Sequence, residues 1–139
     1  MRIDIPADKR FVHDMIMPIR WGDMDAFGHV NNTVFFRYME QARVEWVESM
    51  GMKVDGGAQA MLMINGFCNF YQQLSYPGSI KLQTYIGSIG KTSVDVYTTM
   101  SLTDAPDILV AAGGATMVCV DLQTNRSMPW PEFILSKMK

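Results

Sequence analysis

Hydrophobic residues recur at intervals of three and four between about Thr33 and Met50. The apolar positions in this stretch are Phe35, Tyr38, Met39, Ala42, Trp46, Val47 and Met50. Charged and amide side chains occupy most positions between them, so the pattern predicts one long amphipathic helix. Asn31 or Asn32 is a suitable N-cap, and Gly51 is typical of the residue just beyond a helix C-terminus.

A two-residue period, typical of half-buried strands, runs through most of the remaining chain. Met15–Trp21 is predicted to be a first strand, in which Pro18 indicates a sheet edge or a strand start because proline cannot donate to a central ladder. Four further strands are predicted after the helix, at Met61–Leu74, Ile80–Ile86, Ser93–Leu102 and Ile108–Asp121. The turn segments between them, around residues 76–79, 90–92 and 103–107, predict successive antiparallel hairpins.

Two local features complete the predicted fold. Gly113 and Gly114 interrupt a nearly all-apolar strand, which indicates a bend or bulge in a curved sheet. Pro131 is followed by a stretch, Glu132 to Met138, that predicts a short terminal helix. A curved antiparallel sheet around one central helix buries both the apolar strand faces and the broad apolar helix surface, so the predicted class is α+β.

Composition limits the protein to one domain and a few classes of partner. The 139 residues are 48% hydrophobic and 19% charged, enough for a single sizeable core and one domain, 1–139. The net charge is −2 without a Lys and Arg cluster, so we expect binding neither to nucleic acid nor to a membrane surface. The N-terminal residues do not resemble a signal peptide, so we expect a cytoplasmic protein. Cys68 and Cys119 lie in apolar strand-like runs and are predicted to be buried free thiols.

The strongest chemical signal is the segment from Arg20 to Asn32, which leads from the first predicted strand into the helix. It brings two carboxylates, Asp23 and Asp25, and the imidazole of His29 to a helix N-terminus. The first turn of a helix has unpaired N–H groups and partial positive charge, so it can polarise a carbonyl oxygen while a carboxylate handles water or attacks. The pattern therefore indicates acyl-transfer chemistry.

Several of these side chains also have a structural interpretation. Asp25 fits a turn or a helix cap as well as a catalyst. Asp23 would face away from it on a continuing strand and pair with Arg20 or Arg43. Glu40 lies three residues before Arg43 and can either pair with it on the helix surface or line the site. The acidic residues and histidine match no known metal-ligand spacing, so we expect neither a metal nor another cofactor.

Three features occur together in this chain: Asp25, the turn Gly28-His29-Val30-Asn31-Asn32, and Glu40 with Arg43 on the helix. With the order of elements along nearly the whole chain, they resemble the 4-hydroxybenzoyl-CoA thioesterase family of hotdog-fold acyl-CoA thioesterases. The resemblance implies a hotdog fold and hydrolysis of an acyl-CoA or acyl-carrier-protein thioester. It also implies a homodimer or dimer of dimers, with pockets between the helix of one chain and the sheet of its partner.

The resemblance assigns expected roles to individual residues. The catalytic carboxylate falls on Asp25, and the N–H that polarises the thioester carbonyl falls at about Asn32. Gly28 keeps the turn compact and lets the thioester approach the backbone. Further candidates for substrate contact are Asn31, Thr33, Tyr38 and Glu40 near the helix, and Lys91, Ser93 and Arg126 for the CoA phosphates.

The chain also departs from parts of the family. Some members carry a histidine where this chain has Asn32, and plant acyl-carrier-protein thioesterases have an asparagine in place of Phe27. His29 matches a histidine of the plant group, and it either takes part in proton transfer or orders the loop.

Other questions stay open at this point. Asp25 acts either as a general base on water or as a nucleophile that forms an anhydride. Candidates for the acyl pocket are Tyr38, Met39, Met61, Met63, Phe67 and Phe70, all of which are equally typical of an ordinary core. Two rival functions are a hotdog enoyl-CoA hydratase and a non-catalytic acyl-CoA-binding protein. Measured cleavage of a thioester distinguishes both from a thioesterase.

Overall fold

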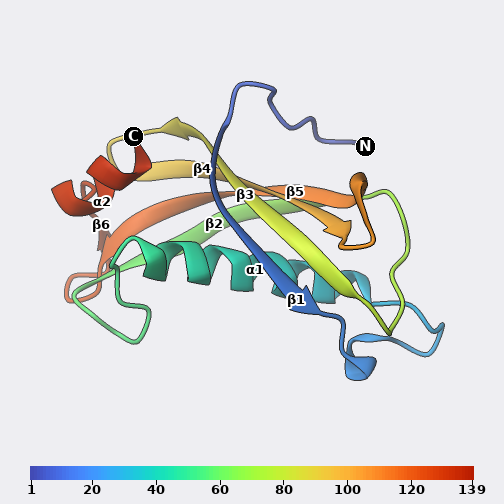
Figure 1. The fold of residues 1–139 in the computed structure, drawn as a ribbon. Helices are drawn as coiled ribbons and strands as arrows, with labels where there is room; N and C mark the ends of the chain where they lie inside the picture. The colour runs from blue at the N-terminus through green and yellow to red at the C-terminus, as the bar shows by residue number, and fades with distance from the viewer.

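One antiparallel sheet and one long helix make up most of the structure, a computed structural model that describes residues 1–139. The elements are β1 (Arg10–Pro18), η1 (Trp21–Asp23, a 3-10 helix), α1 (Asn32–Ser49), β2 (Gln59–Phe70), β3 (Ser79–Ile89), β4 (Ser93–Leu102), β5 (Ala105–Asp121), β6 (Arg126–Ser127) and α2 (Glu132–Met138). The sheet curves over α1, which lies against one of its faces (Figure 1). The predicted α+β architecture is confirmed.

The long helix is as the periodicity predicts. Asn31 is the N-cap, since its side-chain oxygen accepts from the N–H of Thr33 at 2.9 Å. Gly51 follows the C-terminal end with φ 89°, a conformation that glycine adopts without steric cost. All seven residues of the predicted apolar face are buried: Phe35, Tyr38, Met39, Ala42, Trp46, Val47 and Met50.

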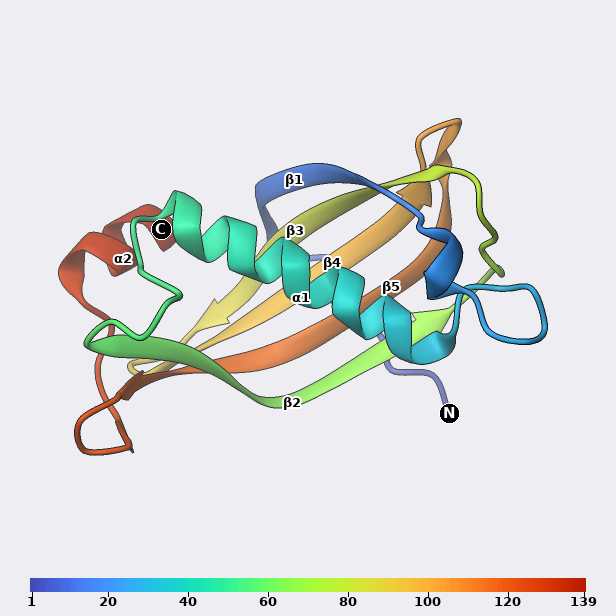
Figure 2. The same cartoon turned by 90° about the horizontal axis from the view of Figure 1, so that it is seen from below.

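The strand order is β1-β3-β4-β5-β2, with β6 paired to β5. Figure 2 shows α1 lying across this sheet, with β1 at one edge and β2 at the other. The predicted hairpins β3–β4 and β4–β5 are confirmed, but the predicted hairpin at residues 76–79 is wrong because β2 pairs with β5 and β3 pairs with β1. Residues 71–78 instead connect the two sides of the sheet, passing the start of α1, where the N–H of Val30 donates to Leu74 O at 2.8 Å.

Some strand boundaries differ from the prediction. The first strand covers Arg10–Pro18 rather than Met15–Trp21, so Pro18 closes an edge strand instead of starting one. A proline without an N–H ends the ladder there, and the chain turns into η1. The second strand ends at Phe70, four residues before the predicted end at Leu74.

Of the predicted bend or bulge at the paired glycines of β5, the bulge is absent. Pairing with β2 continues without a register shift through Gly113 and Gly114, while β2 itself is irregular between Met63 and Asn65. A Cβ at Gly113 would lie 2.8 Å from Met39 Sδ, and one at Gly114 would lie 2.8 Å from a Tyr97 ring carbon. The glycines therefore permit close approach of α1 on one face of the sheet and of an aromatic ring on the other.

The core consists of two clusters along α1. One surrounds Phe35 and Tyr38 in the first half of the helix. The other surrounds Trp46 in the second half and includes Trp130, which lies just before α2. The confirmed helix α2 closes the second cluster, where Lys137 Nζ donates to Met50 O at 3.0 Å at the end of α1.

Both cysteines are free, as predicted, although only Cys119 is fully buried and Cys68 is half-buried. Burial raises the pKa of the Cys68 thiol to about 11. None of the helices combines the length and apolar character needed to cross a membrane.

Candidate active site

A tight loop between η1 and α1 carries most of the predicted site residues. The N–H of Asp25 donates to His29 O at 2.9 Å, and the N–H of Gly28 donates to Asp25 O at 3.0 Å. Met24 and Val30 form an antiparallel bridge at the base of the loop. Gly28 has φ 80°, so this turn favours glycine, as the sequence predicts. The loop is therefore ordered by its own backbone hydrogen bonds.

Asp23 is the buried anchor beneath this loop. Its Oδ2 accepts from Tyr38 Oη at 2.7 Å and from the N–H of Arg20 at 3.0 Å. The Arg20 guanidinium lies 3.6 Å from Oδ1, whereas Arg43, the other predicted partner, contacts Met63 Sδ at 3.7 Å. The backbone of Asp23 also accepts from the N–H of Asn31 at 3.0 Å. Asp23 is therefore committed to holding the loop and the helix start together.

Tyr38 does not occupy the position expected of a substrate contact. Its side chain is 0% exposed, and its hydroxyl donates to Asp23. Burial, together with the neighbouring carboxylate, raises the pKa of this hydroxyl. The structure places Tyr38 in the core because its position on α1 faces the sheet.

Asp25 lies in a different environment from Asp23, only two residues away. It is half-buried, and its Oδ1 accepts from the N–H of Phe27 at 2.9 Å. Its Oδ2 accepts from Asn31 Nδ2 at 3.2 Å. Two neutral donors therefore orient this carboxylate without an ion pair, and it keeps acceptor capacity for a ligand.

The first N–H of α1 has no partner in the chain. Asn31 accepts from the N–H of Thr33 through its side chain and from the N–H of Val34 through its carbonyl. The N–H of Asn32 makes no hydrogen bond. This free donor stands at the positive end of an 18-residue helix.

A cleft of about 400 Å³ brings the three predicted catalytic residues together. It is lined by Asp25, Phe27, His29, Val30, Asn32, Phe35, Phe70, Tyr71, Gln72 and Gln73. The His29 imidazole makes no hydrogen bond, so the loop does not depend on this side chain for its order. The arrangement brings Asp25, His29 and Asn32, the residue whose N–H has no partner, to one partly aromatic cleft.

The sequence interpretation missed part of this lining. The strand predicted over Met61–Leu74 includes Tyr71, Gln72 and Gln73, but these residues begin the connection that passes the start of α1. The adjacent amides, next to a turn segment with Pro77, were the available signal that the strand had ended.

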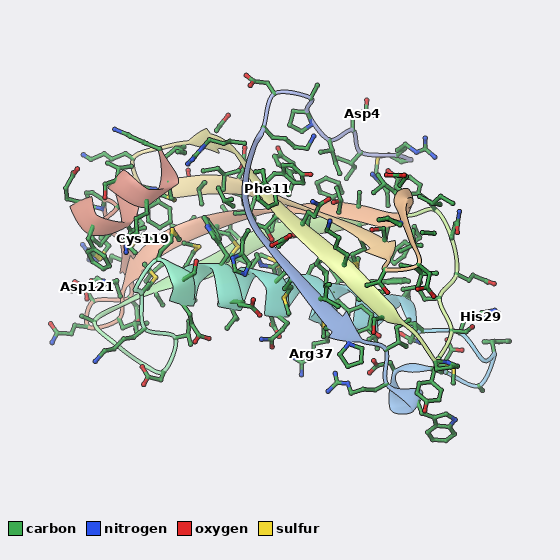
Figure 3. The ribbon with its side chains drawn as sticks, in the orientation of Figure 1. Asp4, Phe11, His29, Arg37, Cys119 and Asp121 are labelled. Carbon is green, nitrogen blue, oxygen red and sulfur yellow. The ribbon has the colours of Figure 1, made fainter.

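The remaining candidates lie outside the cleft. Glu40 is exposed and pairs with Arg37 at 2.9 Å, not with Arg43, which was one of the two possibilities that the sequence left open. Lys91 and Ser93 lie near α2, where Trp130 donates its backbone N–H to Lys91 O and its indole N–H to Ser93 O. This end of the molecule, which also contains Cys119, is opposite to the end with His29 (Figure 3). Within one chain, Lys91 and Ser93 therefore do not adjoin Asp25, and neither does Arg126, which lies in β6 against the end of β5.

A second cavity of about 380 Å³ lies between α1, β2 and the segment that joins them. Glu40 and Arg43 line it with mainly apolar residues, among them the acyl-pocket candidates Met61 and Met63. Burial lowers the pKa of the Arg43 guanidinium, while the charge of Glu40 acts in the opposite direction. No group of three or more His, Cys, Asp or Glu side chains is placed to hold a metal ion.

Comparison with known proteins gives consistent matches. The sequence profile of the thioesterase-like superfamily matches residues 19–138. The PA2801 protein of Pseudomonas aeruginosa, provisionally assigned as a thioesterase, is 31% identical, with coverage of 94% of this chain and 100% of that one and a TM-score of 0.89. Protein SAV2348 of Staphylococcus aureus, solved in complex with CoA, is 14% identical, with coverage of 97% and 85% and a TM-score of 0.84. YsmA of Bacillus subtilis strain 168, an uncharacterized protein, is 21% identical over 82% of this chain and 76% of its own. The predicted hotdog fold is confirmed.

The role of Asp23 predicts the effect of removing one hydroxyl. Tyr38→Phe deprives a buried carboxylate of a donor, so we expect the free energy of unfolding to fall by about 1–3 kcal/mol in urea titrations. Tyr85→Phe is the matched control, because the Tyr85 ring packs against Phe11 at 5.8 Å in either variant. Equal effects of the two substitutions would contradict the structural role of the Tyr38 hydroxyl.

Proposed function

Because the chain belongs to the thioesterase-like superfamily, we propose that it hydrolyses the thioester of a small or medium acyl-CoA with Asp25 as its catalytic carboxylate. Membership in this superfamily confirms the prediction that the protein is a thioester hydrolase. The observation that carries the finer proposal is that Asp25 and Asn32, whose N–H has no partner in the chain, line one cleft. The complex of SAV2348 with CoA supports a CoA-type ligand.

In the proposed reaction, the thioester carbonyl oxygen accepts a hydrogen bond from the N–H of Asn32. The partial positive charge of the helix N-terminus favours the negative charge that develops on this oxygen. Asp25 accepts a proton from a water molecule whose oxygen attacks the carbonyl carbon. The carbon–sulfur bond then breaks, giving a carboxylic acid and a thiolate that takes up a proton. The thiolate is a good leaving group, because its thiol has a pKa near 8.5, so it needs little help to depart.

A direct attack by Asp25 is the alternative that the geometry equally allows. The carboxylate oxygen would then form an anhydride with the acyl group and release the thiolate, and water would hydrolyse the anhydride. Asn31 is a positioning residue in both versions. It donates to Asp25 and accepts from the first turn of α1, so it sets the relation between carboxylate and carbonyl donor.

The proposed assembly is a homodimer or dimer of dimers. β2 is an edge strand, and it exposes three consecutive apolar side chains, Leu62, Met63 and Ile64. An exposed apolar edge strand is a surface that native proteins usually cover. A second copy pairing along β2 would cover it and bring the second cavity next to the partner.

Asp25→Asn tests the catalytic assignment. We expect kcat for thiol release from short, long and aromatic acyl-CoAs to fall by about two or more orders of magnitude, with the fold retained. Asp104→Asn is the control, since Asp104 is an exposed turn carboxylate outside the cleft. Equal release by wild type and the Asp25 variant would exclude this mechanism. No release by wild type, together with hydration of an enoyl-CoA or with binding alone, would select one of the rival functions.

His29→Asn separates substrate contact from proton transfer. The proposal gives His29 a binding role, because it lines the cleft and the leaving thiolate does not require an acid. We expect KM to rise about three- to tenfold while kcat changes by less than about threefold. A fall in kcat of about a hundredfold with an altered pH profile would instead assign proton transfer to His29.

The assembly is tested by light scattering and a pair of edge variants. We expect wild type to have about twice the 15.7 kDa chain mass, or four times it. Ile64→Lys on β2 should lower this mass, while Ile16→Lys on β1 should not, although both isoleucines are 65% exposed. A monomeric wild type, or equal loss in both variants, would contradict pairing along β2.

A further inference from the structure

The N-terminal segment Arg2–Lys9, here called the strap, lies on the face of the sheet opposite to α1. Figures 1 and 3 show it above the sheet, with Asp4 labelled on it. It continues into β1 at one sheet edge and is attached to β2 at the other. Asn69 Nδ2 donates to Ile3 O at 2.7 Å, and Asn69 Oδ1 accepts from the N–H of Ile3 at 3.4 Å. This reciprocal pair holds the beginning of the strap beside the end of β2.

The attachment places Arg2 against a wall of the candidate cleft. The Arg2 guanidinium lies over the Tyr71 ring, with its central carbon 5.5 Å from the ring centroid. Phe70 and Tyr71 line the cleft that contains Asp25, and they also line a neighbouring hollow of about 330 Å³ together with Met1 and Arg2. Arg2 and the cleft therefore adjoin the same two aromatic residues.

Arg2 is a positive charge without an acidic partner, and the cleft lining contains no fixed positive charge. The cleft lining contains no Lys or Arg, and Asp25 is its one carboxylate. Arg20 and Arg37 are paired with acids, whereas Arg2 has no carboxylate partner. A guanidinium presents several N–H donors in a plane and binds phosphate oxygens by charge-assisted hydrogen bonds. Its stacking on Tyr71 restricts its orientation without using those donors.

We propose that Arg2 is a specificity-determining residue that binds a phosphate group of the thioester's carrier, beyond the pantetheine arm. This inference rests on the proposed thioesterase function and names the part of the substrate recognised outside the reacting centre. Two sources provide the same chemistry: the phosphates on the adenosine side of CoA, and the 4′-phosphate that CoA shares with the arm of a carrier protein. Remote binding of this kind acts on substrate affinity and does not take part in bond breaking.

Three thioesters with the same acyl group test the proposal: acyl-CoA, acyl-4′-phosphopantetheine and acyl-pantetheine. For Arg2→Ala we expect KM for acyl-CoA to rise about tenfold at unchanged kcat, with no change for phosphate-free acyl-pantetheine. Arg2→Lys should restore part of the affinity because it keeps the charge. A matching rise for acyl-4′-phosphopantetheine assigns the contact to the 4′-phosphate, and no rise assigns it to the adenosine side.

Lys9→Ala is the matched control, because Lys9 lies on the same strap and its Nζ is 5.1 Å from the centroid of Tyr85, which does not line the cleft. An equal rise in KM for acyl-CoA and acyl-pantetheine in Arg2→Ala would overturn the proposal, since it would assign Arg2 to holding Tyr71. An unchanged KM for acyl-CoA would overturn it as well.

Calorimetric titration with CoA and with pantetheine separates this proposal from the proposed reaction. If wild type cleaves no thioester but binds CoA, the thioesterase proposal fails. Weaker CoA binding in Arg2→Ala, with unchanged binding of pantetheine, would still support the phosphate contact. Equal CoA affinity in wild type and variant, or no binding of CoA by wild type, would overturn it.

Discussion

The hydrogen bond from Tyr38 to the buried carboxylate of Asp23 is the contact on which the geometry of the cleft depends. It joins a core residue of α1 to η1, and the backbone of Asp23 is bound to Asn31 at the helix start. The helix is in turn held against the sheet by its buried face. The packed helix thus fixes the position of the turn that precedes it.

Asp23 and Asp25 show how different surroundings give two identical side chains different roles. Asp23 is 8% exposed and is surrounded by a hydroxyl, a backbone N–H and a guanidinium. Asp25 is half-buried, accepts from two neutral donors and faces a cleft. A buried carboxylate with its acceptors occupied has little capacity left for a ligand, while a half-exposed one retains it. The structural role and the proposed catalytic role therefore follow from solvent access and partners.

The two ends of the molecule differ: one contains the cleft, and the other is closed by core packing. At one end the turn before α1 and the residues at and after the end of β2 line the cleft, and the start of the strap is attached to the same end of β2. At the other end α2 and Trp130 close the core, and the β3–β4 turn with Lys91 is bound into this packing. Within one chain, Lys91 and Ser93 therefore lie apart from the cleft.

The sequence by itself determined the main elements near the site and indicated which groups are candidates for catalysis. The apolar period from Phe35 to Met50 specifies the helix, the Asn31 cap and Gly51 specify its ends, and the short polar side chains with Gly28 specify the turn, all of which are local effects. Only the tertiary structure decided which strands pair, because a turn such as residues 76–79 reverses the chain without selecting its neighbour. It also decided that Tyr38 serves Asp23, that Glu40 pairs with Arg37, and that Arg2 reaches Tyr71 from the opposite face of the sheet. The first and last of these contacts join residues that are far apart in the sequence, and Glu40 has two arginines at equal spacing. The local pattern of the sequence specifies neither kind of choice.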